Sequence, residues 1–175
     1  MAFPSFNSGD TLMASDMNAV GLWLIKTQTI GNAVSSVNVT SAFSSTYDSY
    51  LITINGGVAS ANSFLKMTLG SSATGYYQAR QGIVYGGARS DGTDNNTAAW
   101  TAVGSSQTDS LSLYMTLNNP GVAKFTQVNS YYLGSTAATM VTGEHRVATA
   151  YTDFTIAPNS GTITGGTIRV YGYKN

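Results

Sequence analysis

The chain has 175 residues, of which 42% are hydrophobic and only 9% are charged, and its eight basic and eight acidic side chains give a formal net charge of zero. It has no Cys, a single His and a single Glu. This composition excludes structural disulfides and thiolate zinc sites, and it leaves few groups for proton transfer or for the electrostatic capture of nucleic acid.

The first 21 residues differ in pattern from the rest of the chain. Residues 9–12 predict a turn, and residues 15–20 predict one short helical turn with Ser15 as its N-cap. We interpret residues 1–21 as an arm that docks onto a partner, with a simple lead-in to the first strand as the alternative. The apolar side chains expected to make the docking contacts are Phe6, Leu12, Met13 and Met17.

We expect no signal peptide in the same segment. Its start lacks the basic region and the long apolar region of a signal peptide. The apolar run at residues 20–25 is much shorter than the roughly 20 residues that a membrane span needs. We therefore expect synthesis in a cytoplasm and no membrane insertion.

From residue 22 onward, short β-rich runs alternate with clusters of Gly, Ser, Asn and Asp at a spacing of roughly 8–12 residues, which is typical of a sandwich or barrel. Apolar residues alternate with other residues most clearly at 65–69, 111–117 and 168–170, which predicts strands with one face on a core. The expected strands cover residues 22–29, 35–40, 50–55, 64–69, 76–85, 98–103, 110–117, 123–132, 144–149, 152–157 and 167–173.

These elements predict an all-β fold, a jelly-roll-like β-sandwich of roughly 8–11 strands over residues 22–175 with a short N-terminal arm. We expect the first strand, 22–29, to lie near the last, 167–173, because chain termini are often close in space. The longest irregular stretch, 86–97, is expected to be a polar surface loop.

Glu144, His145 and Arg146 form the only cluster of residue types that commonly perform catalysis. On a strand, Glu144 and Arg146 share one face and His145 takes the other, so the three side chains do not converge. We interpret the cluster as a solvated or interface strand and predict that the protein is not an enzyme. A Ser-His-Asp triad is recognised by geometry rather than by spacing, so that alternative stays open at this point.

Oxygen ligands gather at Asp91, Asp94, Asn95 and Asn96. They do not follow the order of a calcium-binding loop, and no Glu closes the site. We expect a solvated loop here, with no metal and no cofactor.

The eleven Tyr and two Trp residues include the doublets Tyr76-Tyr77 and Tyr131-Tyr132. In a doublet on a strand, one ring faces inward and the other outward. Exposed Tyr and Trp rings suit sugar stacking or protein contacts. The alternative is that these rings fill a small β-core. The candidate surface-recognition residues are Tyr76, Tyr77, Asp91, Asp94, Trp100, Tyr131 and Tyr132.

Two parts of the sequence resemble a known group of proteins. The opening FNSGDTLMASDMN at residues 6–18 resembles a leader of tailed-bacteriophage virion proteins. The segments LWLIKTQTIG at 22–31, AFSSTYDSY at 42–50 and GGTIRVYGYK at 165–174 are similar to small β-rich structural proteins of these phages, which serve as tail, fibre or decoration components. The resemblance carries no catalytic signature and assigns no functional residue.

The resemblance implies a bacteriophage virion structural protein. We expect a tail-fibre or tail-tip subunit that docks by its arm and presents the β-sandwich outward, with host-surface glycans as one contact. The alternatives are a capsid decoration or cement protein, a free carbohydrate-binding module and, last, an enzyme. The expected partners are other virion proteins and further copies of the chain, as a homo-oligomer such as a trimer, because so little charge separates neighbouring copies. The expected location is the virion, assembled in the host cytoplasm, without nucleic acid as a partner.

Overall fold

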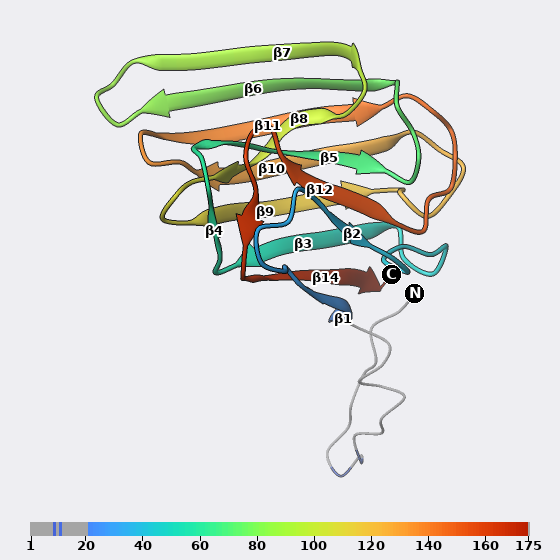
Figure 1. The fold of residues 1–175 in the computed structure, drawn as a ribbon. Coiled ribbons are helices and arrows are strands. Elements are labelled where there is room, and N and C mark those ends of the chain that lie inside the picture. Colours follow the sequence, from blue (N-terminus) through green and yellow to red (C-terminus); the bar gives the residue numbers. More distant parts are fainter. Residues whose placement is uncertain (1–8, 10, 12–20, 175) are drawn as a thin grey trace.

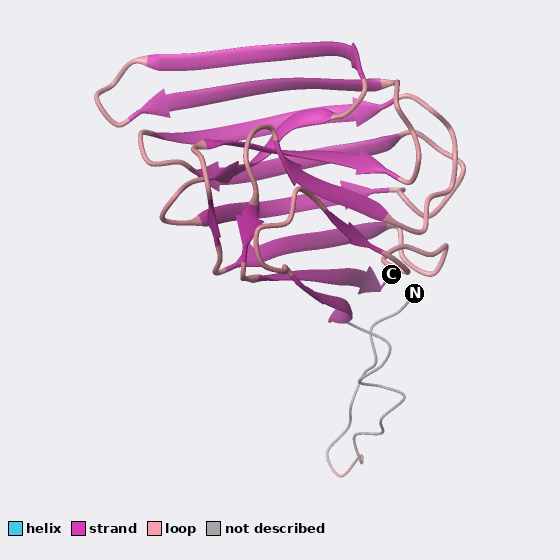
Figure 2. Cartoon of the chain, in the orientation of Figure 1, coloured by secondary structure: helices cyan, strands magenta, loops and turns pink. Residues whose placement is uncertain are grey.

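The structure is a computed structural model that describes residues 9, 11 and 21–174. The predicted docking residues of the arm, Phe6, Leu12, Met13 and Met17, lie outside the described residues. The described part of the chain consists of strands and connecting loops (Figures 1 and 2), and it contains no helix with the length and apolar character that a membrane span requires. The strands are β1 (Gly21–Thr29), β2 (Val37–Val39), β3 (Ser49–Asn55), β4 (Val58–Ala59), β5 (Ser63–Leu69), β6 (Tyr76–Val84), β7 (Arg89–Thr97), β8 (Trp100–Ser106), β9 (Leu111–Asn118), β10 (Thr126–Leu133), β11 (Ala137–His145), β12 (Phe154–Pro158), β13 (Ile163–Thr164) and β14 (Thr167–Lys174).

Twelve of the strands form two antiparallel layers, and β4 and β13 pair with each other as a separate two-stranded sheet. One layer has the order β1-β14-β3-β9-β10-β11-β6-β7, and the other has the order β2-β12-β5-β8. The layers are joined at the β8–β9 connection, where two residue pairs, Ser105 with Ser112 and Ser106 with Leu111, continue the hydrogen bonding from one layer into the other. This arrangement is a β-sandwich, as the alternation of apolar and polar residues predicts.

Eight of the strands have jelly-roll topology. The half-layer β1-β14-β3-β9 packs against β2-β12-β5-β8. When these eight strands are renumbered in chain order, the two sheets become 1-8-3-6 and 2-7-4-5, the arrangement of two interlocked Greek keys. The prediction of a jelly-roll-like fold is therefore confirmed.

Two hairpins extend the larger layer beyond the jelly roll. The β6–β7 hairpin is inserted between β5 and β8, and the β10–β11 hairpin is inserted between β9 and β12. Together they add β10, β11, β6 and β7 to the free edge of β9 (Figure 1). We call these four strands the extension.

The core lies between the layers and follows the alternation in the sequence. Leu65, Met67 and Leu69 of β5 are fully buried, and so are Ile168 and Val170 of β14. Their partners across the core include large aromatic and aliphatic side chains, and burying each such side chain contributes about 1.5–3 kcal/mol relative to exposure. The largest fully buried side chains are Trp100, Tyr50, Tyr76, Phe154, Ile30, Ile52, Leu65, Met67, Leu69, Met115, Leu117 and Ile156.

The first and last strands pair as expected. β1 and β14 are antiparallel from Gly21 opposite Lys174 to Thr29 opposite Thr167, with one irregularity between Leu24 and Lys26. This pairing places β1 at one edge of the larger layer, while β7 forms the other edge.

Three sequence-based expectations about strands are wrong. The described residues form 14 strands, more than the expected number. Residues 86–97 were expected to form an irregular loop, but Arg89–Thr97 form β7, which pairs with β6. Its side chains are polar because an edge strand outside the core has no apolar face to bury, and polar or charged residues protect such an edge from aggregation. The strand expected at 144–149 ends at His145 and begins at Ala137, because β11 lies in the extension and also lacks a continuous apolar pattern.

Candidate functional site

The outer face of the extension, the side away from the four-stranded layer, is not covered by another layer of the described chain. The burial of β10 alternates strictly, with Tyr131 and every second residue from it exposed. Directly opposite residues form a row across five strands, from Tyr114 of β9 to Tyr131, Met140, Gln81 and finally Asp91 of β7. Such cross-strand partners lie on the same face of a sheet. The exposed fractions of Tyr114, Tyr131 and Met140 are 49%, 51% and 57%.

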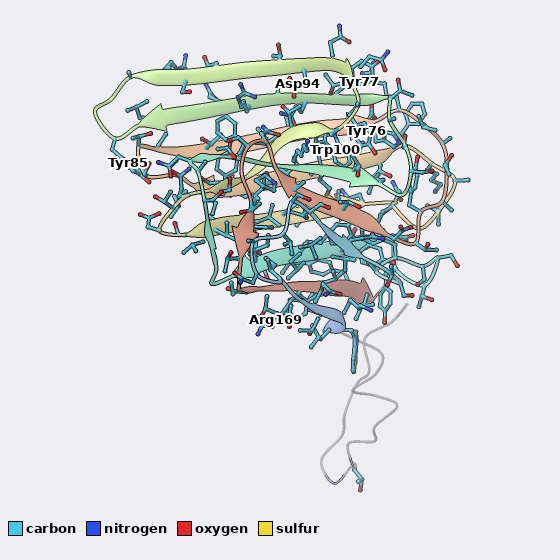
Figure 3. The ribbon with its side chains drawn as sticks, viewed as in Figure 1. Tyr76, Tyr77, Tyr85, Asp94, Trp100 and Arg169 are labelled. Atoms are coloured by element: carbon cyan, nitrogen blue, oxygen red, sulfur yellow. The ribbon has the colours of Figure 1, made fainter. Side chains whose placement is uncertain are left out.

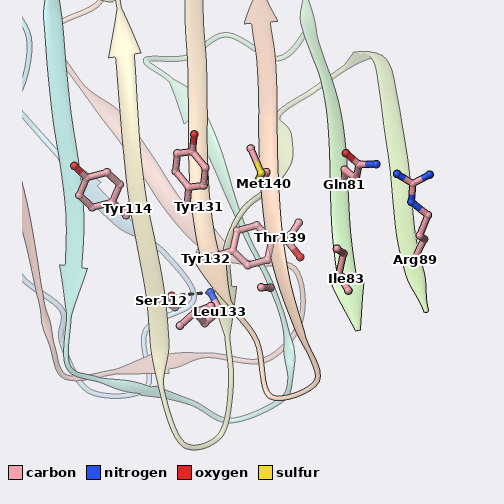
Figure 4. Close-up of a pocket in the computed structure, with 11 residues that line it drawn as sticks. Gln81, Ile83, Arg89, Ser112, Tyr114, Tyr131, Tyr132, Leu133, Thr139 and Met140 are labelled. Carbon is pink, nitrogen blue, oxygen red and sulfur yellow. Dashed lines mark hydrogen bonds between the residues drawn. The ribbon is translucent and has the colours of Figure 1, made fainter. Parts of the chain in front are cut away.

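A second row continues this face toward the β10–β11 turn. Leu133 of β10 lies opposite Ala138, which lies opposite Ile83, which in turn lies opposite Arg89. The backbone N–H of Leu133 donates a hydrogen bond of 3.0 Å to Oγ of Ser112 on β9. The two rows enclose an apolar hollow of about 540 Å³ (Figure 4).

The opposite end of the same face is polar. One row runs from Asn129 to Thr142, Ala79 and Thr93, and the next runs from Gln127 to Glu144 and Tyr77. Around them lies a hollow of about 570 Å³. A third hollow, of about 280 Å³, shares residues with both of the others and joins them. We call this continuous depression the outer-face trough, and its main lining residues are Gln127, Asn129, Thr142, Ala79, Gln81, Tyr131, Met140, Tyr114, Ile83 and Leu133.

The polar end of the trough holds one ion pair, and Asp94 also lines it. Nε of Arg146 lies 2.8 Å from Oε2 of Glu144, and the guanidinium carbon lies 4.3 Å from the ring centroid of Tyr77. The hydrogen bond to Glu144 raises the pKa of Arg146 above its ordinary value. Glu144 and Arg146 therefore share one face, as the strand alternation predicts, and Arg146 covers the Tyr77 ring.

His145 occupies the opposite face and is fully buried. Its Nε2 lies 2.7 Å from the hydroxyl oxygen of Tyr151, and its ring stacks on Tyr76 with centroids 4.1 Å apart. Burial lowers the pKa of His145 below its ordinary value, so the neutral form is favoured in the folded protein. The prediction that His145 does not converge with Glu144 and Arg146 is confirmed.

Three of the candidate surface-recognition residues are not at the surface. Tyr76, Trp100 and Tyr132 are buried, so their proposed role in surface recognition is wrong. The Tyr76 hydroxyl accepts a hydrogen bond of 2.7 Å from the N–H of Leu69, and Nε1 of Trp100 donates one of 3.2 Å to the carbonyl of Tyr77. The ring of Tyr76 packs against that of Trp100 with centroids 5.1 Å apart, and the ring of Tyr132 lies 6.0 Å from that of Phe64. Figure 3 labels Tyr76 and Trp100.

The other candidates divide between the two faces. Tyr131 is at the centre of the trough, and Tyr77 is at its polar end under Arg146. Each doublet therefore has one ring inside and one outside. Asp91 lies in the outer row, whereas Asp94 lies opposite the buried Gln78 and accepts a hydrogen bond from Oγ1 of Thr101.

Several residues of the trough were absent from the sequence-based candidates. They include Tyr114 and Met140, which the register brings beside Tyr131, and Leu133, which lies two residues along the same strand. A signal for Tyr114 was present, because it is the polar-face residue between the buried Leu113 and Met115. No comparable signal marks Met140, since its position depends on the pairing of β11 with β10.

The trough offers recognition chemistry: aromatic rings, amides and hydroxyls held on rigid strands. Among the described residues, no group of three or more His, Asp or Glu side chains is placed to hold a metal ion. No protein-family model matches the chain, and neither a curated protein nor a solved structure matches it.

Proposed function

We propose that the chain is a structural subunit of a tailed-bacteriophage virion, attached by residues 1–21 and presenting its jelly roll outward for contact with the host surface. The observation that carries the proposal is the position of the uncovered face: the trough lies on the extension and the adjoining strand β9, while the chain enters the sheet at the opposite edge, in β1. The resemblance of residues 6–18 to phage leaders supplies the virion context. Jelly rolls also occur in viral capsid and lectin domains, which is an analogy of fold alone.

The spacing of the strands sets the distance between the β1 edge and the β7 edge of the larger layer. Seven inter-strand intervals separate β1 from β7 across the larger layer (Figure 1). At roughly 4.8 Å per interval, the two edges are roughly 34 Å apart. A subunit anchored just before β1 therefore holds the extension well away from its attachment point, which suits a protein that meets a partner outside the particle.

Attachment and folding are separable in this proposal. Deletion of residues 2–20 leaves every described strand intact, so we expect a folded protein that no longer enters particles. Incorporation is measured by mass spectrometry of purified particles, and folding by thermal unfolding of the purified protein. Normal incorporation of the shortened chain would contradict the docking role of the arm.

The number of copies per particle distinguishes a tail position of the chain from a head position. We propose a tail-fibre or tail-tip position, in which the chain forms a homo-oligomer such as a trimer and occurs in few copies per particle. A capsid decoration or cement protein would instead occur in large numbers on the head surface. Labelling of intact particles with an antibody to the β-domain would place the chain on one structure or the other.

A further inference from the structure

We propose that the outer-face trough binds a neutral oligosaccharide, with the rings of Tyr114 and Tyr131 as its stacking platform. This inference deepens the proposed function, on which it rests for the setting in which the ligand is met. The argument uses the length of the trough, its side chains, its charge and its shape.

The trough is long enough for several sugar units. Along β10 its lining runs from Gln127 to Leu133, which are six residues apart. At roughly 3.3 Å per residue this distance is roughly 20 Å. The three hollows share lining residues, so one extended ligand can follow the strand direction without interruption.

The side chains suit the two kinds of surface that a sugar presents. Tyr114 and Tyr131 stand on neighbouring strands with about half of each side chain exposed (Figure 4), and their rings offer flat apolar area with a hydroxyl at the tip. Beside them, Asn129 and Gln81 offer amide donors and acceptors, and Thr142 offers a hydroxyl. Because all five side chains project from paired strands, their spacing is fixed before a ligand arrives.

The charge of the trough favours a neutral ligand. At the polar end, the positive charge of Arg146 is paired with Glu144. At the apolar end, Arg89 and Asp91 lie two residues apart on β7 and provide one charge of each sign. The joining hollow adds the partly buried Arg80, and Asp94 also lines the polar end. Three positive and three negative side chains therefore lie in or beside the trough, so it presents no excess of one sign that would select an acidic polysaccharide.

The shape of the trough favours a ligand over a second copy of the chain. A two-fold contact places the same patch of both subunits face to face. Two depressions opposed in this way would leave their hollows unfilled, and unfilled space at an interface loses packing energy. A narrow chain that lies along the trough fills it instead.

The test compares three variants of the full chain on an array of neutral and acidic bacterial surface oligosaccharides. Tyr131→Thr removes the ring but keeps a residue that favours strands, and Tyr131→Phe keeps the ring. Phe125→Thr is the matched control, because Phe125 has a 46% exposed side chain and lines none of the hollows. Thermal unfolding confirms that each variant is folded.

The wild type is expected to bind at least one neutral oligosaccharide. Tyr131→Thr should weaken this binding at least about tenfold, as truncation of a central aromatic contact does, while Tyr131→Phe and Phe125→Thr bind like the wild type. The inference is overturned if no neutral oligosaccharide binds, if Tyr131→Thr binds as well as Phe125→Thr, or if Tyr131→Thr instead converts an oligomer to monomers in sedimentation. None of these outcomes bears on whether the chain is present in particles, so the virion proposal stands or fails separately.

Discussion

Nε2 of His145 lies 2.7 Å from the hydroxyl oxygen of Tyr151, in a buried cluster that the rings of Tyr76 and Trp100 complete. The contact joins the end of β11 to the segment that leads into β12. A cationic imidazole has no carboxylate partner at this position among the hydrogen bonds and ion pairs of the described residues. The cluster therefore ties the stability of the β-domain to the protonation of one side chain.

We predict that acid destabilises the fold through His145. Its pKa is lowered by burial, so the unfolded chain binds the proton more readily than the folded chain does. The contribution of neutral His145 to the free energy of unfolding is complete above the pKa of His in the unfolded chain, about 6.5. This contribution is lost as the pH falls from there toward the pKa of His145 in the folded protein. In urea unfolding between pH 7.5 and pH 5.5, the unfolding free energy should fall with pH, with a slope of at most about 1.4 kcal/mol per pH unit for this single proton.

His145→Gln provides the control for this prediction. Glutamine can still hydrogen-bond Tyr151 but does not titrate. The variant should be less stable than the wild type near pH 7, because the stacking on Tyr76 is lost, yet its unfolding free energy should change much less over the same pH range. Equal pH slopes for the two proteins would show that another group controls the response.

We predict that Gly57 cannot be replaced. Its φ of 84° lies in the left-handed region, and a Cβ there would overlap the carbonyl oxygen of Gly165. Gly57→Ala should therefore lower the free energy of unfolding by about 1–3 kcal/mol from strain alone, and by more if the two turns are forced apart. Chemical denaturation measures the change.

Gly86→Ala is the matched substitution for that measurement. An added Cβ at Gly86 meets no atom within 4 Å, and its φ is not in the left-handed region. We expect an unchanged stability or a gain of about 0.4–1 kcal/mol from the less flexible unfolded chain. A loss at Gly86 as large as that at Gly57 would contradict the close approach of the two turns.

We predict that β7 opens more readily than the strands of the jelly roll. It pairs only with β6, and most of its side chains are exposed. Few buried apolar contacts therefore oppose its separation from the sheet. Amide hydrogen exchange should be fastest in β7 among the long strands of the larger layer and slowest in β3 and β9, whereas equal protection of β7 and β9 would mean that the extension unfolds only with the core.

The jelly roll was predictable because each of its main strands shows, in its own sequence, an alternation of apolar and other residues. In β5, Leu65, Met67 and Leu69 alternate with side chains outside the core, and this alternation needs no knowledge of the partners. β7 has no such pattern, because Asp91, Asp94 and their neighbours solvate an edge strand as readily as they solvate a loop. The strand exists because β6 offers it a hydrogen-bonding edge, which is a property of the tertiary structure.

The candidate site was predictable only in part, for a related reason. The two Tyr doublets predict that one ring of each pair faces inward. Which of Tyr131 and Tyr132 is buried depends on which face of β10 meets the core. The trough itself combines Tyr114, Tyr131 and Met140 from strands whose neighbours are set by two inserted hairpins. That register cannot be derived from one strand at a time.

The virion proposal is tested most directly by quantitative mass spectrometry of purified particles. These are the phage particles whose genome encodes the chain. We predict peptides from the whole β-domain, co-purifying with tail proteins through density-gradient centrifugation at a fixed low copy number per particle. Mature particles that contain no peptide of the chain, while the infected cell contains many, would contradict the proposal.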